Sequence, residues 1–331
     1  MVQINQVYEA VANSTQYAYI VKEDNPSIYQ ELNFGGRPFT VRDGQVMPPV
    51  INKIVFGYAD NYTKYYDTFT AKRGLSVHFL INSDGNIAQL VDPALRAWYG
   101  GTSPWDGQLI YDGKDCEPGS CKPKLSGSVN DNGIGIWLTY EGNSSNAVFT
   151  LQTIDSTAEL AHMLMSQYNI PQTNILSYDD GRIDKDGRHI EQDWQVTLPF
   201  AELASRGIGI YPDASNISNA KLKIIAQESK AVQCVQIELR AFGYQLNNDG
   251  SFTYPTSDAI RVFHKHFNQA QYKANPQEEE WSEQDQYIIT ELLKAKYGQD
   301  LIVFDCFSIS PEEVVTSGAI SNFITFSHDL P

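Results

Sequence analysis

Basic side chains are scarce in this sequence. Its 331 residues include 24 lysines and arginines against 40 aspartates and glutamates, which gives a formal net charge of −16. Proteins that bind nucleic acid neutralise phosphates with clustered lysine and arginine, and anionic membrane surfaces attract the same side chains. We therefore expect neither nucleic acid nor a membrane surface among the partners.

Long apolar segments are absent as well. No run reaches the roughly 18 apolar residues typical of a membrane-spanning helix. The start of the chain, Met1–Asn5, lacks the basic region and apolar run of a signal peptide. Neither a Gly-rich phosphate loop nor a Ser-His-Asp or Cys-His set is apparent. The sequence thus predicts no membrane span, and it gives no sign of a nucleotide site or of a serine or cysteine hydrolase.

Cysteine is limited to four residues. Cys116 and Cys121 lie in a loop that contains proline and glycine, and a zinc clamp would need a second such pair nearby. We therefore take Cys116 and Cys121 as disulfide candidates. Cys234 and Cys306 either pair with each other or are two small buried hydrophobic residues.

The chain divides into four parts by pattern. Residues 1–50 predict an irregular N-terminal lead, 51–215 a compact β/α domain, 220–298 a small all-helical domain, and 299–331 a tail that packs back on the body or adds a strand. Within the β/α domain, short apolar stretches predict strands and one stretch has helical spacing. The expected strands are 53–58, 76–81, 87–91, 133–140 and 174–178, and the expected helices are 151–168 and 199–205.

Four motifs in the β/α domain resemble the zinc-dependent N-acetylmuramoyl-L-alanine amidases of AmiD type. They are Ser76–Ile81 with a following Asp-Gly hairpin, Ala97–Gly101, Gly133–Ile136 and Arg206–Asp213. Each motif alone is moderately specific, but their order along one chain is much more so. The resemblance implies an α/β fold with a mixed β-sheet flanked by helices.

The second domain is similar to a three-helix peptidoglycan-binding module. The motif residues are Val235–Tyr244, Asp249–Phe252 and Ser257–His264. His264 stands where the family usually has glutamine. The resemblance implies that peptidoglycan is the partner, with Gln236 and Tyr244 among the ligand-binding candidates.

The amidase resemblance breaks at the positions that carry the chemistry. The family holds one Zn²⁺ with three protein ligands and a water, which the metal activates for attack. Gly57 and Tyr178 stand at the places of two histidine ligands, and Asp193 matches the third ligand. Trp137 replaces the acid/base glutamate, and Glu191 replaces a lysine that stabilises negative charge. We therefore expect no catalytic residue, no bound metal and no cofactor.

The positions that remain could serve binding instead of catalysis. In this fold Trp98, Tyr99, Trp137 and Tyr178 would lie along the groove past the former metal. Aromatic rings can stack on sugars, so these four are ligand-binding candidates. The alternative is that Trp137 and Tyr178 fill the space that zinc and its ligands left.

A rearranged metal site is the competing interpretation. It would use Asp193 with His189, four residues earlier, and with Glu141. His78 matches a histidine that is a structural neighbour of the site in the family and is not a ligand.

The sequence thus favours a catalytically inactive amidase-like protein that binds peptidoglycan at the cell envelope or in the periplasm. Such a protein would suit a structural or adaptor role, for example as an accessory subunit of an envelope-spanning secretion complex with protein subunits as further partners. The alternative functions are an active amidase with a rearranged metal site, and a regulator that mimics an amidase.

Overall fold

The computed structural model of the chain separates into two compact units. The first contains Met1–Tyr178 and Ala201–Gly209, and the second contains Asp179–Phe200 and Ile210–Pro331. The structure describes residues 4–6, 34–35, 37, 39–42, 45–47, 50–70, 75–101, 103, 105, 109–111, 124–125, 128–184, 186–222, 229–277, 279–303, 305–309 and 324–326. Cys116 and Cys121 lie outside these residues, so their pairing stays a prediction.

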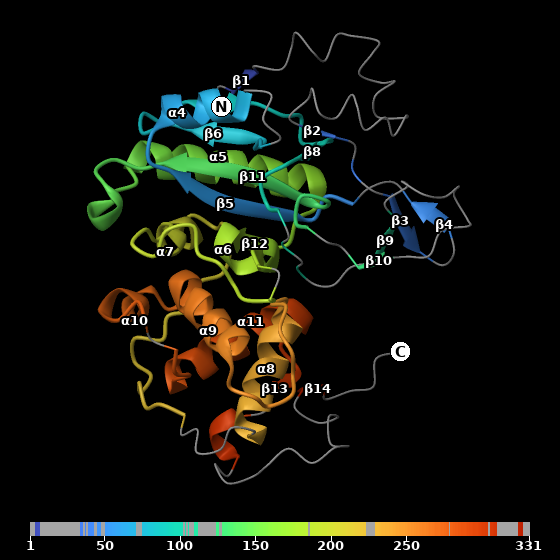
Figure 1. Cartoon of the computed structure of the whole chain (residues 1–331), viewed down its shortest axis with the longest axis vertical. Helices are drawn as coiled ribbons and strands as arrows, with labels where there is room; N and C mark the ends of the chain where they lie inside the picture. Colours follow the sequence, from blue (N-terminus) through green and yellow to red (C-terminus); the bar gives the residue numbers. More distant parts are fainter. Residues whose placement is uncertain are drawn as a thin grey trace. The chain divides into compact units, whose positions relative to one another are not determined.

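A six-stranded mixed sheet forms the core of the first unit (Figure 1). Its order is β1-β7-β6-β11-β5-β12, and every neighbouring pair is parallel except β6 with β7. The strands are β1 (Ile4–Gln6), β5 (Lys53–Ala59), β6 (Phe79–Ile81), β7 (Ile87–Gln89), β11 (Gly133–Thr139) and β12 (Ile175–Ser177). All seven residues of β5 and of β11 are buried, as expected for central parallel strands covered on both faces. The predicted fold class is confirmed.

Two helices of the first unit pack against this sheet. α5 (Leu151–Tyr168) lies on β11 and β6, and α4 (Tyr62–Thr70) contacts β6. Thr150 caps the start of α5 by accepting a hydrogen bond from the Thr153 amide, and Asn169 ends it in the left-handed conformation. α5 has the bounds that its apolar spacing predicts. Among the described residues, no helix combines the length and apolar character needed to cross a membrane.

The N-terminal lead is more regular than predicted. β1 adds an edge strand to the main sheet, and β2 (Phe34–Gly35) pairs with β8 (Arg96–Ala97). A separate four-stranded sheet has the order β10-β9-β3-β4. Its strands are β3 (Phe39–Arg42), β4 (Gln45–Met47), β9 (Leu109–Tyr111) and β10 (Lys124–Leu125). The prediction of an irregular lead over 1–50 is wrong at these strands, because strands of two to four residues are too short to show periodicity.

The second unit is mainly helical, and its helices within residues 230–297 are drawn in orange and red in Figure 1. Its four main helices are α8 (Lys230–Phe242), α9 (Tyr254–Phe267), α10 (Gln269–Ala274) and α11 (Glu283–Tyr297). α11 packs on α8, and α10 packs on α9. The short α10 was not predicted. Two further short helices, α6 (Tyr178–Gly181) and α7 (Phe200–Ser205), lie where the chain passes between the units.

The tail is attached to the helical unit. β13 (Leu301–Val303) pairs antiparallel with β14 (Ile324–Phe326) and packs against α11. The 3₁₀ helix η3 (Cys306–Ser308) packs against α8, where Cys306 forms a disulfide with Cys234 across 72 residues of chain. Of the two alternatives for these cysteines, pairing is the one observed.

Candidate functional site

We call the five positions that the resemblance assigns to amidase chemistry the amidase-type positions; they are Gly57, Trp137, Tyr178, Glu191 and Asp193. Those of the first unit meet at the centre of its sheet. Gly57 of β5 and Trp137 of β11 are register partners in the parallel ladder. A Cβ atom built on Gly57 would lie 2.3 Å from Cε2 of Trp137 and 2.5 Å from Cζ2. Real Cβ atoms do not approach other heavy atoms so closely. The indole of Trp137 therefore occupies the space that a side chain at position 57 would need.

Aromatic rings surround this indole. The rings of Tyr178 and Tyr99 lie 5.3 and 5.4 Å from it between centroids, and the ring of Phe69 lies at 6.2 Å, all three in edge-to-face arrangements. Trp137 is 4% exposed, and Tyr99 is 2% exposed. We call Phe69, Tyr99, Trp137 and Tyr178 the aromatic cluster. The four rings of the cluster bury apolar surface against one another and fill the space between them.

A second glycine, Gly135, leaves room for the ring of Tyr99. A Cβ on Gly135 would lie 2.7 Å from Cδ1 and Cε1 of Tyr99, so the ring lies flat against the bare backbone of β11. The Tyr99 hydroxyl donates to the Val129 carbonyl at 3.3 Å, and burial raises the pKa of this phenol. Tyr99 and Trp137 therefore present no free ring face for a sugar, although both were predicted as ligand-binding residues. Trp98 and Tyr178 remain half-buried.

His78 is held as a neutral structural residue beside the cluster. Its Nδ1 accepts from the Gly135 amide at 2.9 Å, and its Nε2 donates to the Leu95 carbonyl at 3.0 Å. Burial, together with the Arg37 guanidinium 3.2 Å from Nε2, lowers the pKa of His78 to about 3. Both ring nitrogens have protein partners, so His78 has the structural role that the resemblance implied.

Arg37 was missed by the sequence analysis. Its guanidinium is buried and donates to four backbone carbonyls, those of Pro93, Asn130, Asp131 and Gly133. Burial lowers its pKa to about 10. The arginine thus joins the N-terminal lead to the loop before β11. The sequence gives no signal for this role, because Arg37 is a lone arginine in a stretch of weak periodicity.

The remaining two amidase-type positions, Glu191 and Asp193, belong to the second unit. Glu191 accepts from Arg261 Nε at 2.5 Å and from the Tyr272 hydroxyl, and Lys265 Nζ lies 3.4 Å away. The Glu191 side chain is 8% exposed. Burial and the Glu191 carboxylate together raise the pKa of Tyr272. The negative charge at position 191 is therefore matched by two cations from α9.

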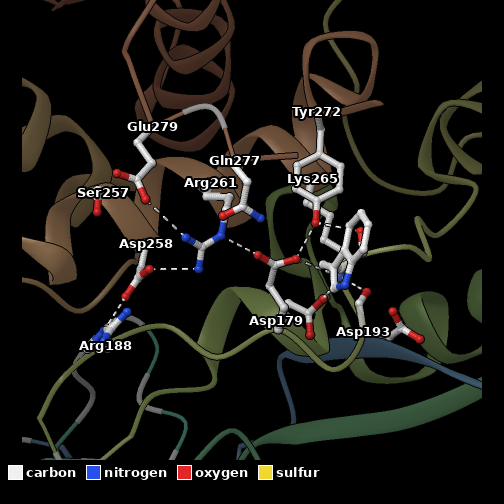
Figure 2. Close-up of polar contacts among 12 residues, drawn as sticks. Asp179, Arg188, Asp193, Ser257, Asp258, Arg261, Lys265, Tyr272, Gln277 and Glu279 are labelled. Atoms are coloured by element: carbon white, nitrogen blue, oxygen red, sulfur yellow. Dashed lines mark hydrogen bonds and ion pairs between the residues drawn. The ribbon is translucent and has the colours of Figure 1, made fainter. Parts of the chain in front are cut away.

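Lys265 connects the same segment at two further points. Its Nζ donates to Asp179 Oδ2 at 2.6 Å and to the Asp193 carbonyl at 2.7 Å. Asp179 is buried, and burial raises its pKa in spite of the lysine beside it. The Asp193 carboxylate is half-exposed and accepts from the Gln195 amide at 2.9 Å. Figure 2 shows Lys265 reaching this segment from α9.

Arg261 extends the network along α9. It contacts Asp258 at 2.8 Å and Glu279 at 3.5 Å, and Asp258 also accepts from Arg188 at 2.8 Å (Figure 2). We call this set the ion-pair network; its members are Asp179, Arg188, Glu191, Asp258, Arg261, Lys265 and Glu279. A sequence signal existed: the charged residues Asp258, Arg261 and Lys265 recur at helical spacing along α9.

The two ligand-binding candidates of the helical domain are also internal. Gln236 is 1% exposed, donates to Thr256 Oγ1 at 2.9 Å and accepts from the Gly250 amide at 2.8 Å. Tyr244 is fully buried and donates to Asp180 at 2.8 Å. Both side chains hold loops to helices inside the protein and present no surface to a ligand.

The residues proposed for a rearranged metal site are found in different surroundings. His189 is 3% exposed and packs edge-to-face on Tyr244, and burial lowers its pKa to about 4. Glu141 lies past the end of β11, exposed, and its backbone bridges to Val148. Within either unit, the described residues bring three side chains of metal-ligating type together only at Cys234, Glu238 and Cys306. The sulfurs of that group are joined in a disulfide.

Comparison with known proteins agrees with the fold. The profile of a family described as N-acetylmuramoyl-L-alanine amidase matches residues 47–194. The chain is 27% identical to N-acetylmuramoyl-L-alanine amidase AmiD of Escherichia coli K12 over 276 residues, or 79% of this chain and 88% of AmiD. It is 25% identical over 227 residues to the putative N-acetylmuramoyl-L-alanine amidase RC0497 of Rickettsia conorii, covering 67% and 76%.

Solved structures show the same architecture. The complex of E. coli AmiD with the substrate anhydro-N-acetylmuramic acid-L-Ala-D-gamma-Glu-L-Lys superposes with a TM-score of 0.54 at 22% identity, covering 80% of this chain and 99% of that one. AmpDh3 of Pseudomonas aeruginosa, in complex with anhydromuramic pentapeptide, gives a TM-score of 0.52 at 19% identity, covering 75% and 92%. At these identities the structures establish the fold alone.

Proposed function

We propose that the chain is an amidase-like protein that binds peptidoglycan without hydrolysing it, on the basis of the match of residues 47–194 to the N-acetylmuramoyl-L-alanine amidase family and of the similarity to AmiD over 79% of the chain. The observation that carries the proposal is the contact between Gly57 and Trp137. The side chain that would donate the first metal ligand is missing, and an indole fills its place.

The residues at the metal positions of the first unit do not fit zinc. Zinc in this class of enzyme takes nitrogen, sulfur or carboxylate ligands and leaves one position open for water. Gly57 has no ligand atom, and the Tyr178 ring packs edge-to-face on Trp137. Without the metal, no hydroxide forms at neutral pH and no Lewis acid polarises the scissile carbonyl. We therefore derive no hydrolytic step for this chain.

The charge at position 191 supports the same proposal. A cation stabilises the negative charge that develops during amide hydrolysis, and glutamate would oppose it. In this chain Glu191 is engaged by Arg261 and Tyr272. Its carboxylate serves to hold the segment around residues 186–195 against α9 and α10, which is a structural role.

Peptidoglycan is proposed as the ligand on the basis of the relatives. AmiD has been solved with a muramyl peptide as substrate, and AmpDh3 with an anhydromuramic pentapeptide. In this chain the half-buried rings of Trp98 and Tyr178 are the candidates of the first unit that retain exposed surface. We propose a place at the cell envelope or in the periplasm, in an adaptor role such as that of an accessory subunit of a secretion complex.

The test combines hydrolysis and binding on the full-length chain. The protein is incubated with purified sacculi and with a muramyl tripeptide, and E. coli AmiD serves as the positive control for release of peptide. We expect the chain to co-sediment with sacculi and to release no L-alanyl peptide. The Trp98→Ala/Tyr178→Ala variant should bind less, whereas Met163→Ala, an exposed residue of α5, should bind as the parent does.

Two outcomes would contradict the proposal. Release of L-alanyl peptide by the chain would establish the alternative, an active amidase with a rearranged metal site. Failure to sediment with sacculi, together with no binding of the muramyl peptide at millimolar concentration, would remove peptidoglycan as the ligand and favour a regulator that mimics an amidase.

A further inference from the structure

Three side chains of metal-ligating type meet inside the second unit, and none of them belongs to the positions that the resemblance assigns to amidase chemistry. They are Cys234 and Glu238 of α8 and Cys306 of η3. One ligand atom from each lies within 4.8 Å of the other two, and all three residues are fully buried. The disulfide between the cysteines accounts for two members of this group, but it gives no reason for a carboxylate beside it.

Local structure brings the three together. Cys234 and Glu238 are four residues apart on α8, so they share one face of the helix, a spacing that many helical metal sites use. Cys306 begins the short helix η3, which Asp305 caps by accepting from the Phe307 amide at 2.9 Å. Packing of η3 on α8 presents Cys306 to the face that carries Cys234 and Glu238.

Glu238 has the surroundings of a metal-binding carboxylate. Both of its oxygens accept from Gln286 Nε2, at 3.0 and 3.1 Å, and among the described residues it forms no ion pair. Trp281 Nε1 donates to Gln286 Oε1 at 3.3 Å, which fixes the amide so that its nitrogen faces Glu238. A carboxylate oriented by a second residue in this way is typical of metal ligands. Burial of a charged carboxylate without a cation is otherwise unfavourable.

We propose that Cys234, Glu238 and Cys306 hold one Zn²⁺ when the disulfide is reduced, with water as the fourth ligand. A thiol or phosphine reductant supplies two electrons, the S–S bond breaks, and each sulfur takes up a proton. Zinc then binds as both thiols lose those protons to solvent. Zn–S bonds of about 2.3 Å and Zn–O bonds of about 2.1 Å place tetrahedral ligand atoms roughly 3.3–3.8 Å apart, so the two sulfurs, which are bonded to each other in the disulfide, move apart when zinc binds.

The disulfide and the zinc site exclude each other, so the redox state selects between them. Either one links α8 to the tail at Cys306. The inference does not rest on the proposed function, because no residue of the aromatic cluster or of the ion-pair network takes part.

The experiment uses the full-length chain in a Cys116→Ser/Cys121→Ser background, which removes the other two thiols. The protein is reduced with a phosphine, incubated with ZnCl₂ and desalted, and its zinc is measured by mass spectrometry. We expect close to one zinc per reduced chain and none per oxidised chain. Co²⁺ in place of zinc should give the thiolate charge-transfer and tetrahedral ligand-field bands.

Variants then test each ligand. Cys234→Ser and Cys306→Ser should abolish tight binding, and Glu238→Gln should weaken it at least tenfold. Glu291→Gln, on α11 and outside the group, should bind zinc as the parent does. The cobalt spectrum of the parent chain keeps the test valid if a variant fails to fold.

The proposal is overturned if the reduced chain, folded by circular dichroism, takes up no more zinc than Cys234→Ser. It is also overturned if zinc binding is unchanged in Glu238→Gln, or if it appears only after the helical signal is lost. In none of these cases is the amidase proposal affected, since its readouts are peptide release and sacculus binding.

Discussion

The aromatic cluster and the ion-pair network show two different ways of burying the positions that the resemblance assigns to amidase chemistry. In the first unit, a glycine and a tryptophan that are partners on adjacent strands are complementary in volume, and the buried surface is apolar. In the second unit, Arg261 and Lys265 of α9 balance the buried anion Glu191. The first arrangement depends on packing and the second on charge, so they should respond to different perturbations.

The largest effect is expected from reversing the charge at position 191. Glu191→Lys removes the partner of Arg261 and Tyr272 and places a third cation beside Lys265. Breaking a buried ion pair in this way should lower the free energy of unfolding by about 3–5 kcal/mol. Urea unfolding followed by circular dichroism measures the change.

The matched control is Glu159→Lys on the exposed face of α5, which changes the net charge by the same amount. It should alter stability by no more than about 0.5 kcal/mol. Equal effects of the two substitutions would show that net charge, and not the network, is responsible.

The second effect concerns pH and the buried His189. Its pKa is lowered to about 4, below the value of about 6.5 in the unfolded chain. The unfolded state therefore binds the proton first, so the stabilisation is complete above pH 6.5 and is lost as the pH falls toward 4. The loss should approach about 1.4 kcal/mol per pH unit.

Unfolding experiments at several pH values, on the parent and on His189→Gln, isolate this contribution. The buried acids Asp179 and Glu238 have raised pKa values and act in the opposite direction, but they are present in both proteins and cancel in the difference. Parallel pH profiles for the two proteins would show that His189 does not titrate as described.

The third effect tests packing in the aromatic cluster. Gly57→Ala puts a methyl group into the indole of Trp137 and should cost about 1–3 kcal/mol. In a Trp137→Leu background the same substitution should cost at least about 1 kcal/mol less, because the contact is gone. Additive effects in this double-mutant cycle would mean that the two positions are not coupled.

The smallest effect is expected at the exposed end of the ion-pair network. The guanidinium of Arg188 lies 4.5 Å from the ring centroid of Tyr254, whose side chain is largely exposed. Tyr254→Ala should cost about 0.5–1 kcal/mol, while Tyr254→Phe, which keeps the ring, should cost almost nothing. A larger loss in the phenylalanine variant would point to a role for the hydroxyl.

Elements with strong local patterns could be predicted from the sequence. The spacing of apolar residues in 151–168 gives α5 with its bounds, and the runs at 53–58 and 133–140 give β5 and β11. The strands of the N-terminal lead could not be found, because each is only two to four residues long, and β1, β2 and β3 also pair with residues far along the chain. Arg37 has its backbone partners 56 to 96 residues away, and no local signal marks such contacts.

The resemblance names the positions of the candidate site, but the surroundings of these positions could be predicted only in part. The resemblance places Gly57, Trp137, Tyr178, Glu191 and Asp193 at chemical positions, and it leaves open whether the rings bind a ligand or fill space. The structure shows Trp137 and Tyr99 packed inside the protein. Glu191 pairs with Arg261 and Lys265 because α9 packs against the segment around residue 190. No sequence pattern in that segment reveals this packing.

The central claim is that the amidase-type positions of this chain hold no zinc. The most direct measurement is the zinc content of the oxidised full-length protein after incubation with excess ZnCl₂ and desalting, since the disulfide blocks the cysteine site. The account predicts no stoichiometric zinc. One zinc per chain that is retained on desalting and lost in Asp193→Ala would contradict it.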